Sequence, residues 1–356
     1  MRLRFCFHLL AVLPLLAPAL VHAQTSRLTG QLGFYDDNEE LADPFAGRQT
    51  LEGVRFQSAW TLATGPSTDL RLGVFLDNRQ EDPQWVRLKP LLSFEYHQGG
   101  TRLIMGTLQS QDRHGLLEPL EDPLLSFARP VEYGLQWLQK DEGFGADVFL
   151  DWQQVDQPGQ DEIFDYGAVL TAPLGPAADL QMQLHAYHEG GRIFNIRVVN
   201  NYNPALGLRL HQDLGFLGPS GLDLFAVTSS DFEGKFDLGP DWGRGIYVKG
   251  RVTPGGWVEL YGIYWNAQDF FSEEGDPQYN SQGNPASFYR ADRVYAEAGL
   301  REDLKLETAD LQAQLKSAWS DEFWGWALRL TLEVPVDLEL PLGAQAPGQK
   351  EGPDAL

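Results

Sequence analysis

The stretch QSQDRHGLLEPLEDPLLSFARP, residues 109–130, gathers residues that could do chemistry together. The charged and titratable members that could form one group are Glu118, Glu121, Asp122, Arg113 and His114. If the carboxylates face basic side chains across a narrow water-filled passage, the opposed charges select solutes by charge and size. His114 also stands two residues after Asp112. An acid and a histidine could form part of a hydrolase site. No nucleophile motif accompanies that pair, and triads are recognised by spatial geometry.

Basic residues that could oppose this group occur in segments where polar and apolar residues alternate. They are Arg55, Arg71, Arg87, Arg102, Lys249, Arg251 and Arg329. In FWGWALRLTLEVPVDL, residues 323–338, Leu328 and Leu330 fall on one face of an extended chain, and Arg329 and Glu333 fall on the other. A period of two predicts a strand with one apolar and one polar face.

Segments of this kind recur about 16 times, and their connections alternate in length. Short Gly/Pro turns such as 64–68, 97–100 and 253–256 are followed by long polar loops such as 109–130 and 267–291. Antiparallel meanders with turns at one end and loops at the other are typical of membrane barrels. The pattern therefore predicts an all-β, up-and-down antiparallel β-barrel that crosses a membrane. A two-sided soluble sheet is the alternative, but it does not require this alternation.

The first 23 residues are set apart from the rest. Arg2 and Arg4 precede an apolar run that reaches Leu20, and Ala23 ends a small-residue cleavage pattern, as in a secretory signal peptide. The single cysteine, Cys6, lies within this segment, so an exported chain would hold no disulfide. The formal net charge of −23 argues against nucleic acid as a partner. An exported chain without cysteine fits the bacterial periplasm or outer membrane. The outer membrane, reached through the periplasm, is the location expected of a membrane barrel.

In its succession of strands, turns and loops, the chain resembles Gram-negative outer-membrane porins across residues 24–338. The resemblance implies a barrel of about 16 strands, within a range of 14–18. It also implies that loop 109–130 folds inward and narrows the lumen opposite the basic wall. Porin barrels usually end on a terminal aromatic residue, whereas this chain continues into a Pro/Gly-rich stretch at 339–356. That stretch is predicted to be a disordered tail.

The function expected from this organisation is diffusion of small hydrophilic solutes through the outer membrane, without a cofactor, a metal or enzymatic activity. The alternatives are export of an acidic polysaccharide with a periplasmic partner, and a barrel hydrolase. Expected partners are outer-membrane lipid, lipopolysaccharide and the permeating solute or polysaccharide, with a homo-oligomer possible. His185 and His188 should point to opposite faces of a strand, which disfavours a two-histidine metal site. The acidic stretches 36–40 and 267–291 are expected to be exposed loops, and most tryptophans are expected at strand ends.

Overall fold

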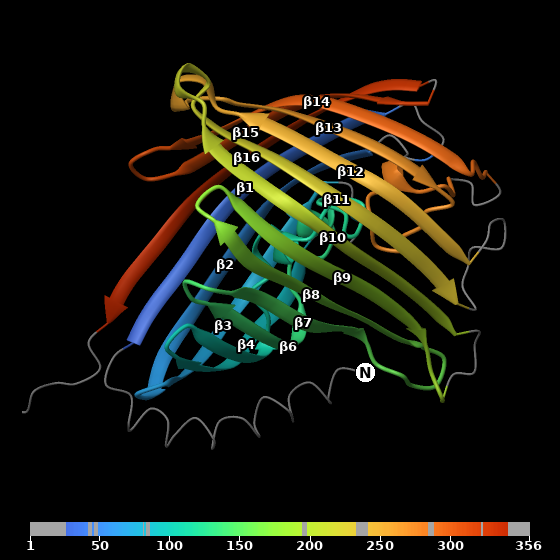
Figure 1. Ribbon diagram of the computed structural model, residues 1–356. Helices are drawn as coiled ribbons and strands as arrows, with labels where there is room; N and C mark the ends of the chain where they lie inside the picture. Colours follow the sequence, from blue (N-terminus) through green and yellow to red (C-terminus); the bar gives the residue numbers. More distant parts are fainter. Residues whose placement is uncertain are drawn as a thin grey trace, which may run out of the picture.

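Sixteen antiparallel strands form one closed barrel in the computed structural model, which confirms the predicted fold class (Figure 1). The structure describes residues 26–41, 45, 49–80, 82, 86–193, 198–232, 241–283, 288–321 and 323–340. The predicted signal peptide and residues 341–356 of the predicted tail lie outside the described residues. The last strand ends at Leu340, two residues beyond the predicted end of the barrel.

Fourteen of the strands have ten or more residues, enough to cross a bilayer, and β5 and β6 are shorter, with seven and eight. The order of the strands in the sheet is their order in the sequence. They are β1 (Ser26–Leu41), β2 (Gln49–Gly65), β3 (Thr68–Arg79), β4 (Arg87–Gln98), β5 (Thr101–Thr107), β6 (Tyr133–Lys140), β7 (Gly145–Gln154), β8 (Glu162–Gly175), β9 (Ala178–Gly190), β10 (Val199–Asp213), β11 (Pro219–Phe232), β12 (Trp242–Val252), β13 (Glu259–Gln268), β14 (Asp292–Lys305), β15 (Asp310–Ser320) and β16 (Phe323–Leu340).

The barrel closes because β1 pairs with both β2 and β16. Ser26 lies opposite Leu340 in this closing pair, so the first and last strands meet at the end that carries the short turns. This end is called the turn end, and the opposite one, which carries the long connections, the loop end. Among the described residues each strand pairs with a neighbour on both sides, which lets a closed sheet cross lipid.

Alternation along each strand separates an apolar outer face from a polar lumen. On β1, Leu32 and Phe34 are 37% and 44% exposed on the outside, and Tyr35 and Asp37 are buried on the inside. The outward residues of the other strands are also largely apolar, as a lipid-facing surface requires. In the described part of the chain, no helix has the length and apolar character needed to span a membrane.

Of the two acidic stretches predicted to be exposed loops, one belongs to a strand and the other is a loop that is largely buried. Residues 36–40 belong to β1, where Asp37 and Glu39 turn into the lumen and are 2% and 7% exposed. Much of the stretch 267–291 is buried as well, including Ser272 and Tyr279. The loop predicted at 36–40 was wrong, and so was the exposure predicted for the buried part of the loop 267–291, because an acidic segment can be buried when cations inside the barrel pair with it. Composition does not reveal those partners.

Candidate functional site

The connection between β5 and β6 folds into the barrel, where Figure 1 shows it as a teal segment behind the wall. It contains the short helices η1 (Gln111–Gly115) and α2 (Leu125–Ala128). Leu117 and Leu120 are 3% and 0% exposed in one apolar cluster with aromatic residues of β12–β14. A second apolar contact lies on β1, where Phe127 packs on Tyr35 with ring centroids 4.9 Å apart. Apolar residues therefore dock this loop at two places on the barrel wall.

A second loop, between β13 and β14, joins the first inside the lumen. The backbone N–H of Asp122 donates to the carbonyl of Glu274 at 2.7 Å, and that of Asp276 donates to the carbonyl of Glu118 at 2.9 Å. The Ser272 hydroxyl donates to the carbonyl of Leu120 at 3.1 Å. These reciprocal bonds make the two loops one layer, which we call the plug (residues 108–132 and 269–283).

The plug reaches the whole inner circumference of the barrel. Each of the sixteen strands contributes at least one buried residue that faces the lumen: Asp37, Leu51, Asp77, Leu91, Ile104, Gln136, Phe149, Asp165, His185, Asn201, Val227, Tyr247, Trp265, Tyr295, Ala318 and Ala327. In an open water-filled lumen these side chains would be exposed to solvent. Their burial means that protein fills the lumen at the level of the plug in this structure.

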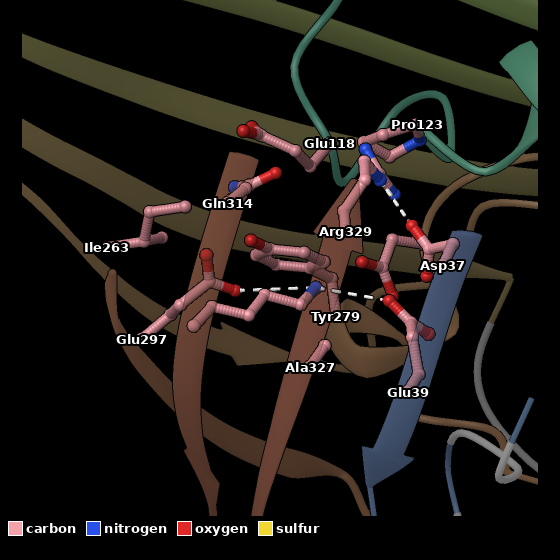
Figure 2. Close-up of a pocket in the computed structure, with 12 residues that line it drawn as sticks. Asp37, Glu39, Glu118, Pro123, Ile263, Tyr279, Glu297, Gln314, Ala327 and Arg329 are labelled. Atoms are coloured by element: carbon pink, nitrogen blue, oxygen red, sulfur yellow. Dashed lines mark hydrogen bonds and ion pairs between the residues drawn. The ribbon is translucent and has the colours of Figure 1, made fainter. Parts of the chain in front are cut away.

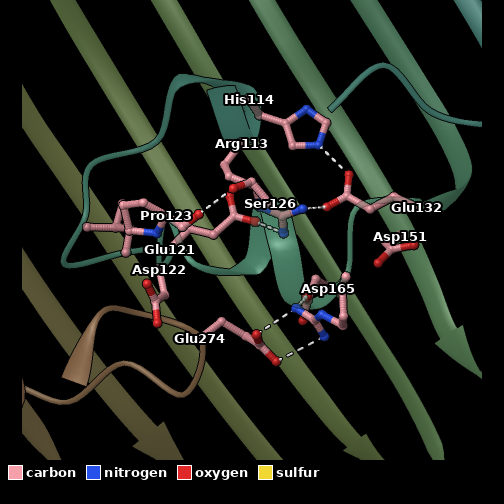
Figure 3. Close-up of polar contacts among 12 residues, drawn as sticks. Arg113, His114, Glu121, Asp122, Pro123, Ser126, Glu132, Asp151, Asp165 and Glu274 are labelled. Atoms are coloured by element: carbon pink, nitrogen blue, oxygen red, sulfur yellow. Dashed lines mark hydrogen bonds and ion pairs between the residues drawn. The ribbon is translucent and has the colours of Figure 1, made fainter. Parts of the chain in front are cut away.

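A buried ion network holds the first loop in place (Figure 3). Arg113 pairs with Glu121 of the same loop and with Glu132 at its end. His114 uses both ring nitrogens, Nε2 to Glu132 and Nδ1 to Asp147 of β7, each at 2.9 Å. The imidazole also stacks on Phe149, with centroids 3.7 Å apart. Its side chain is 0% exposed, so it meets neither solvent nor lipid in this arrangement.

The backbone at this point is strained. Arg113 and His114 have φ angles of +48° and +59°, the left-handed region that residues with a Cβ adopt at a cost of about 1–3 kcal/mol each. Such strain persists only where surrounding contacts hold it, and the ion network supplies those contacts. Gly115 continues the turn at φ +75°, with open space where a Cβ would stand. The ion pairs of Arg113 and His114 therefore help to offset the cost of this backbone conformation.

The pKa values of the titratable side chains in the plug depend on their burial and on the charged groups that contact them. Burial alone would lower the pKa of His114, but its hydrogen bonds to Asp147 and Glu132 outweigh burial and raise the pKa to about 9. For Glu121 burial dominates over the attraction of Arg113 and raises the pKa to about 7. Glu132 is also buried, but His114 and Arg113 lower its pKa to about 2. The protonated His114 is therefore the stable form beside an ionised Glu132.

This ionisation predicts a pH dependence of the barrel's stability. The pKa of folded His114 lies above its ordinary 6.5, so its ion pairs stabilise fully below pH 6.5 and are lost as the pH rises through 9. Between pH 6 and 9.5 the wild type should lose roughly 3 kcal/mol of its free energy of unfolding. Urea unfolding in detergent, followed by tryptophan fluorescence, measures this loss. His114→Gln should flatten the profile in this range, and an unchanged profile would contradict the assignment.

A second network surrounds a small cavity of about 50 Å³ between the plug and β14–β16 (Figure 2). Glu118 of the plug accepts from Lys249 Nζ at 2.8 Å and from the Tyr247 hydroxyl at 2.7 Å. Burial opposes ionisation of Glu118, but Lys249 lowers its pKa to about 2. On the other side of the cavity Lys316 lies 3.3 Å from Glu39. These contacts tie the plug to the wall by charge as well as by apolar packing.

Below the plug, towards the turn end, lies a cavity of about 870 Å³, which we call the vestibule. Plug residues between Gln109 and Val131 line its inner end, and the β14–β15 hairpin lines it at the turn end. Nine of its lining residues are Lys or Arg and six are Asp or Glu. The vestibule thus carries an excess of positive charge in a chain whose net charge is −23.

The residues predicted as a basic wall all lie on the lumen side of their strands, but they are not one group. Those that line the vestibule are Arg55, Arg71, Lys249, Arg251 and Arg329. Arg87 pairs with Asp82 near the loop end. Arg102 pairs with Glu95 at 2.6 Å and donates to Gln109 at 3.0 Å. Glu118, Glu121 and Arg113 also reach the vestibule, and Asp122 and His114 are not among its lining residues.

The outer surface holds a polar group that the sequence reasoning missed. Beyond Leu32 and Phe34, the next outward positions of β1 are Asp36 and Asn38. Glu52 is the register partner of Asp36 on β2, and Thr50 is that of Asn38. The Thr50 hydroxyl donates to Asn38 Oδ1 at 3.0 Å. Together, Asp36, Asn38, Thr50 and Glu52 form what we call the rim group; the alternation from Phe34 to Asp36 could have revealed it.

Two features bear on other chemistry. Among the residues that the structure describes, no three His, Cys, Asp or Glu side chains are placed to hold a metal ion. His185 faces the lumen and is 0% exposed, and His188 faces outward and bonds Asn200 at 2.8 Å. The two histidines therefore point to opposite faces of β9. The side chain of Asp112 lies outside the described part, so its pairing with His114 has no structural account.

Comparison with protein families matches residues 24–319 to the family described as lipid A 3′-O-deacylase-type. No curated protein matches the chain significantly. Among solved structures, a loop L8 deletion mutant of OmpT from Vibrio cholerae has a TM-score of 0.54 at 12% identity, covering 88% of this chain and 99% of that one. OccK8 (OprE) and OccK11 (OpdR) of Pseudomonas aeruginosa both reach 0.53, at 15% and 13% identity. They cover 88% of this chain and 98% and 96% of their own. At this identity the likeness is one of barrel fold.

Proposed function

Because the chain belongs to the lipid A 3′-O-deacylase-type family, we propose that it hydrolyses an acyl ester of a lipid A-type glycolipid in the bacterial outer membrane. The observation that carries the proposal is the rim group, which places carboxylate, amide and hydroxyl groups on the lipid-facing surface of the barrel. A filled lumen is compatible with this function, because the substrate reaches the protein from the side, through the bilayer.

The depth of the rim group suits an ester substrate. On β1 the outward residues change from Leu32 and Phe34 to Asp36, and on β2 from Phe56 and Val54 to Glu52. This change marks the boundary between the apolar band and the headgroup layer at the loop end. The ester bonds of a glycolipid lie at the same boundary, between its acyl chains and its sugars. A lipid standing against β1 and β2 would therefore place its ester beside Asp36 and Glu52.

The placement of these two carboxylates is costly without a function. Like charges directly opposite each other on neighbouring strands destabilise a sheet. Among the described residues, neither Asp36 nor Glu52 has a side-chain hydrogen bond or ion pair that would offset the repulsion. Unfavourable local arrangements of this kind, such as two adjacent like charges, are found mostly at functional sites. The carboxylate pair is thus better explained by a reaction or a ligand than by the stability of the barrel.

The rim group contains the parts that ester hydrolysis needs. Asp36 takes a proton from water, and the resulting hydroxide attacks the ester carbonyl carbon. The Asn38 side-chain amide retains its N–H donors for the developing oxyanion, because the contact with Thr50 occupies only its oxygen. The carbon–oxygen bond then breaks, the sugar oxygen recovers the proton, and a fatty acid leaves. Glu52 is placed to exchange that proton.

The test is the mass of lipid A from Gram-negative cells that express the full-length protein. The proposal expects a species lighter by one ester-linked acyl chain, which Asp36→Asn abolishes at an equal amount of folded barrel. Lipid of unchanged mass from cells with the folded wild type in the outer membrane would overturn the proposal.

A second candidate, a solute channel, is favoured by the vestibule and by the position of loop 109–130 inside the lumen. Conduction would require the plug to leave its place, because every one of the sixteen strands contributes a lumen-facing residue that is buried at its level. Export of an acidic polysaccharide with a periplasmic partner would require the same displacement of both loops.

The channel candidate makes its own prediction. Deletion of residues 116–126 removes Glu118, Leu120 and Glu121, and should convert a barrel with little steady conductance into one with stable steps in planar bilayers. Neutralising Glu118, Glu121 and Asp122 should change the ion selectivity of any remaining current. If the deletion variant folds but conducts no more than the wild type, the channel candidate loses its support.

A further inference from the structure

The turn-end half of the lumen carries positive charge that the protein itself leaves uncompensated. Among the described residues, Arg71 of β3 lines the vestibule without a hydrogen-bond or ion-pair partner. Across the lumen a single carboxylate, Asp223, lies between two guanidinium groups, 3.0 Å from Arg251 and 3.9 Å from Arg209. Nε of Arg209 is buried without a hydrogen-bond partner. The excess therefore lies on β3 and on β10–β12.

Leaving Arg71 without a partner, and two arginines with one carboxylate, is unfavourable, because a partly desolvated guanidinium keeps fewer hydrogen bonds than it has donors. Most other cations in the lumen have a carboxylate, such as Glu333 for Arg55 and Asp37 for Arg329. Arg71, Arg209 and Arg251 each lie within five residues of a short turn, which puts the charge near the turn-end mouth. A planar guanidinium fork suits carboxylate and phosphate oxygens.

From this arrangement we infer that the vestibule is a binding site for small anionic solutes that carry carboxylate or phosphate groups. These solutes enter from the turn end, which faces the periplasm in outer-membrane barrels. The β14–β15 hairpin, with Arg301 and Lys305, lines the entrance. Gly115, Glu118 and Glu121 of the plug lie at the inner end, so a solute is held there and does not pass. The volume of about 870 Å³ accommodates a solute of metabolite size.

The inference does not rest on the proposed ester hydrolysis. The vestibule lies inside the barrel, and the rim group lies on its outer face near the other end. Loss of one function therefore leaves the other measurable. Carboxylate and phosphate groups also occur on lipid headgroups, but a lipid in the bilayer meets only the outer face, so the occupant inside the barrel is a free solute.

Isothermal titration calorimetry of the folded full-length protein in detergent micelles tests this site. The probes are sodium succinate and inorganic phosphate, titrated at an ionic strength held constant with sodium chloride. The wild type should bind at least one probe saturably. Arg71→Gln should weaken that binding roughly tenfold, since it removes a charged hydrogen-bond donor from the site. The matched control is Arg87→Gln, a lumen-side arginine that pairs with Asp82 and does not line the vestibule.

The outcomes are distinct. Weaker binding in Arg71→Gln and unchanged binding in Arg87→Gln support the site, provided that circular dichroism shows the same strand content in all three proteins. Equal binding by the wild type and Arg71→Gln overturns it, as does saturable binding of neither probe. Competition by phosphatidylglycerol vesicles would place the anion on the outer face and would overturn the site inside the barrel.

Discussion

Asp36→Asn should lower the rate of acyl-ester hydrolysis by about 10²–10⁴-fold, the usual contribution of a positioned general base. The substitution keeps the size of the side chain and removes only its ability to accept a proton as a carboxylate. It also removes the repulsion between Asp36 and its register partner Glu52, so the barrel should be as stable as the wild type or slightly more stable. Loss of activity together with retained stability is the signature expected of a catalytic carboxylate. The rate is measured as fatty acid released by purified protein from lipid A in mixed micelles.

The matched control for this experiment is Glu302→Gln. Glu302 is also an outward position, on β14, but it lies at the turn end of the barrel, across the membrane from the rim group. Its replacement should leave the rate of hydrolysis unchanged. Equal losses in both variants would point to a general effect of surface charge and would contradict the assignment of Asp36.

Arg113→Ala should lower the free energy of unfolding by about 3–5 kcal/mol, because it leaves Glu121 and Glu132 buried without their guanidinium partner. The side chain of Arg113 is 6% exposed, so water offers little compensation. The residue also stands at the strained turn, where its ion pairs offset the cost of a positive φ. Urea unfolding in detergent, with tryptophan fluorescence as the signal, measures the loss.

Arg87→Ala supplies the comparison for a half-exposed ion pair. Arg87 contacts Asp82, and its side chain is 39% exposed. Such pairs contribute less than about 1 kcal/mol, so this variant should unfold close to the wild type. If Arg113→Ala and Arg87→Ala lose the same stability, the plug is not held by the buried network described above.

The fold was predictable because the signal repeats in every strand. In β16, Leu328 and Leu330 lie outside, and Arg329 and Glu333 lie inside, as a period of two requires. The outer face must be apolar in lipid, and the lumen face can be polar. The sequence of each strand therefore indicates which of its two faces points outward. The alternation of short and long connections then gives the up-and-down order without any long-range information.

The interior of the barrel was harder to predict. Trp265 is one of the tryptophans expected at strand ends, but its side chain is 0% exposed inside the lumen, where its indole N–H donates to the carbonyl of Tyr279 at 3.1 Å. Its partner lies on the second loop, 14 residues away, and nothing local indicates that this loop turns inward. The burial of Asp37 depends in the same way on Arg329, at the other end of the chain. Contacts between distant segments decide burial in a lumen, and a local pattern does not contain them.

The rim group shows why a site can be missed even when the strand is predicted. The stretch around Asp36 was interpreted as an exposed acidic loop, and so its alternation was not followed beyond Phe34. If the alternation is continued past Phe34, it places Asp36 and Asn38 on the outer face, directly after the apolar band. Their meeting with Glu52 and Thr50 depends on the register of β1 and β2, which the sequence alone does not fix.

The most direct test of the proposed function is the release of fatty acid from lipid A by the purified, folded protein, measured by mass spectrometry. Three proteins are compared: the wild type, Asp36→Asn, and Glu118→Gln, which alters the plug but not the outer face. The account predicts that the wild type and Glu118→Gln each release one acyl chain per lipid and that Asp36→Asn releases almost none. Release that persists in Asp36→Asn, or is absent from the folded wild type, would contradict it.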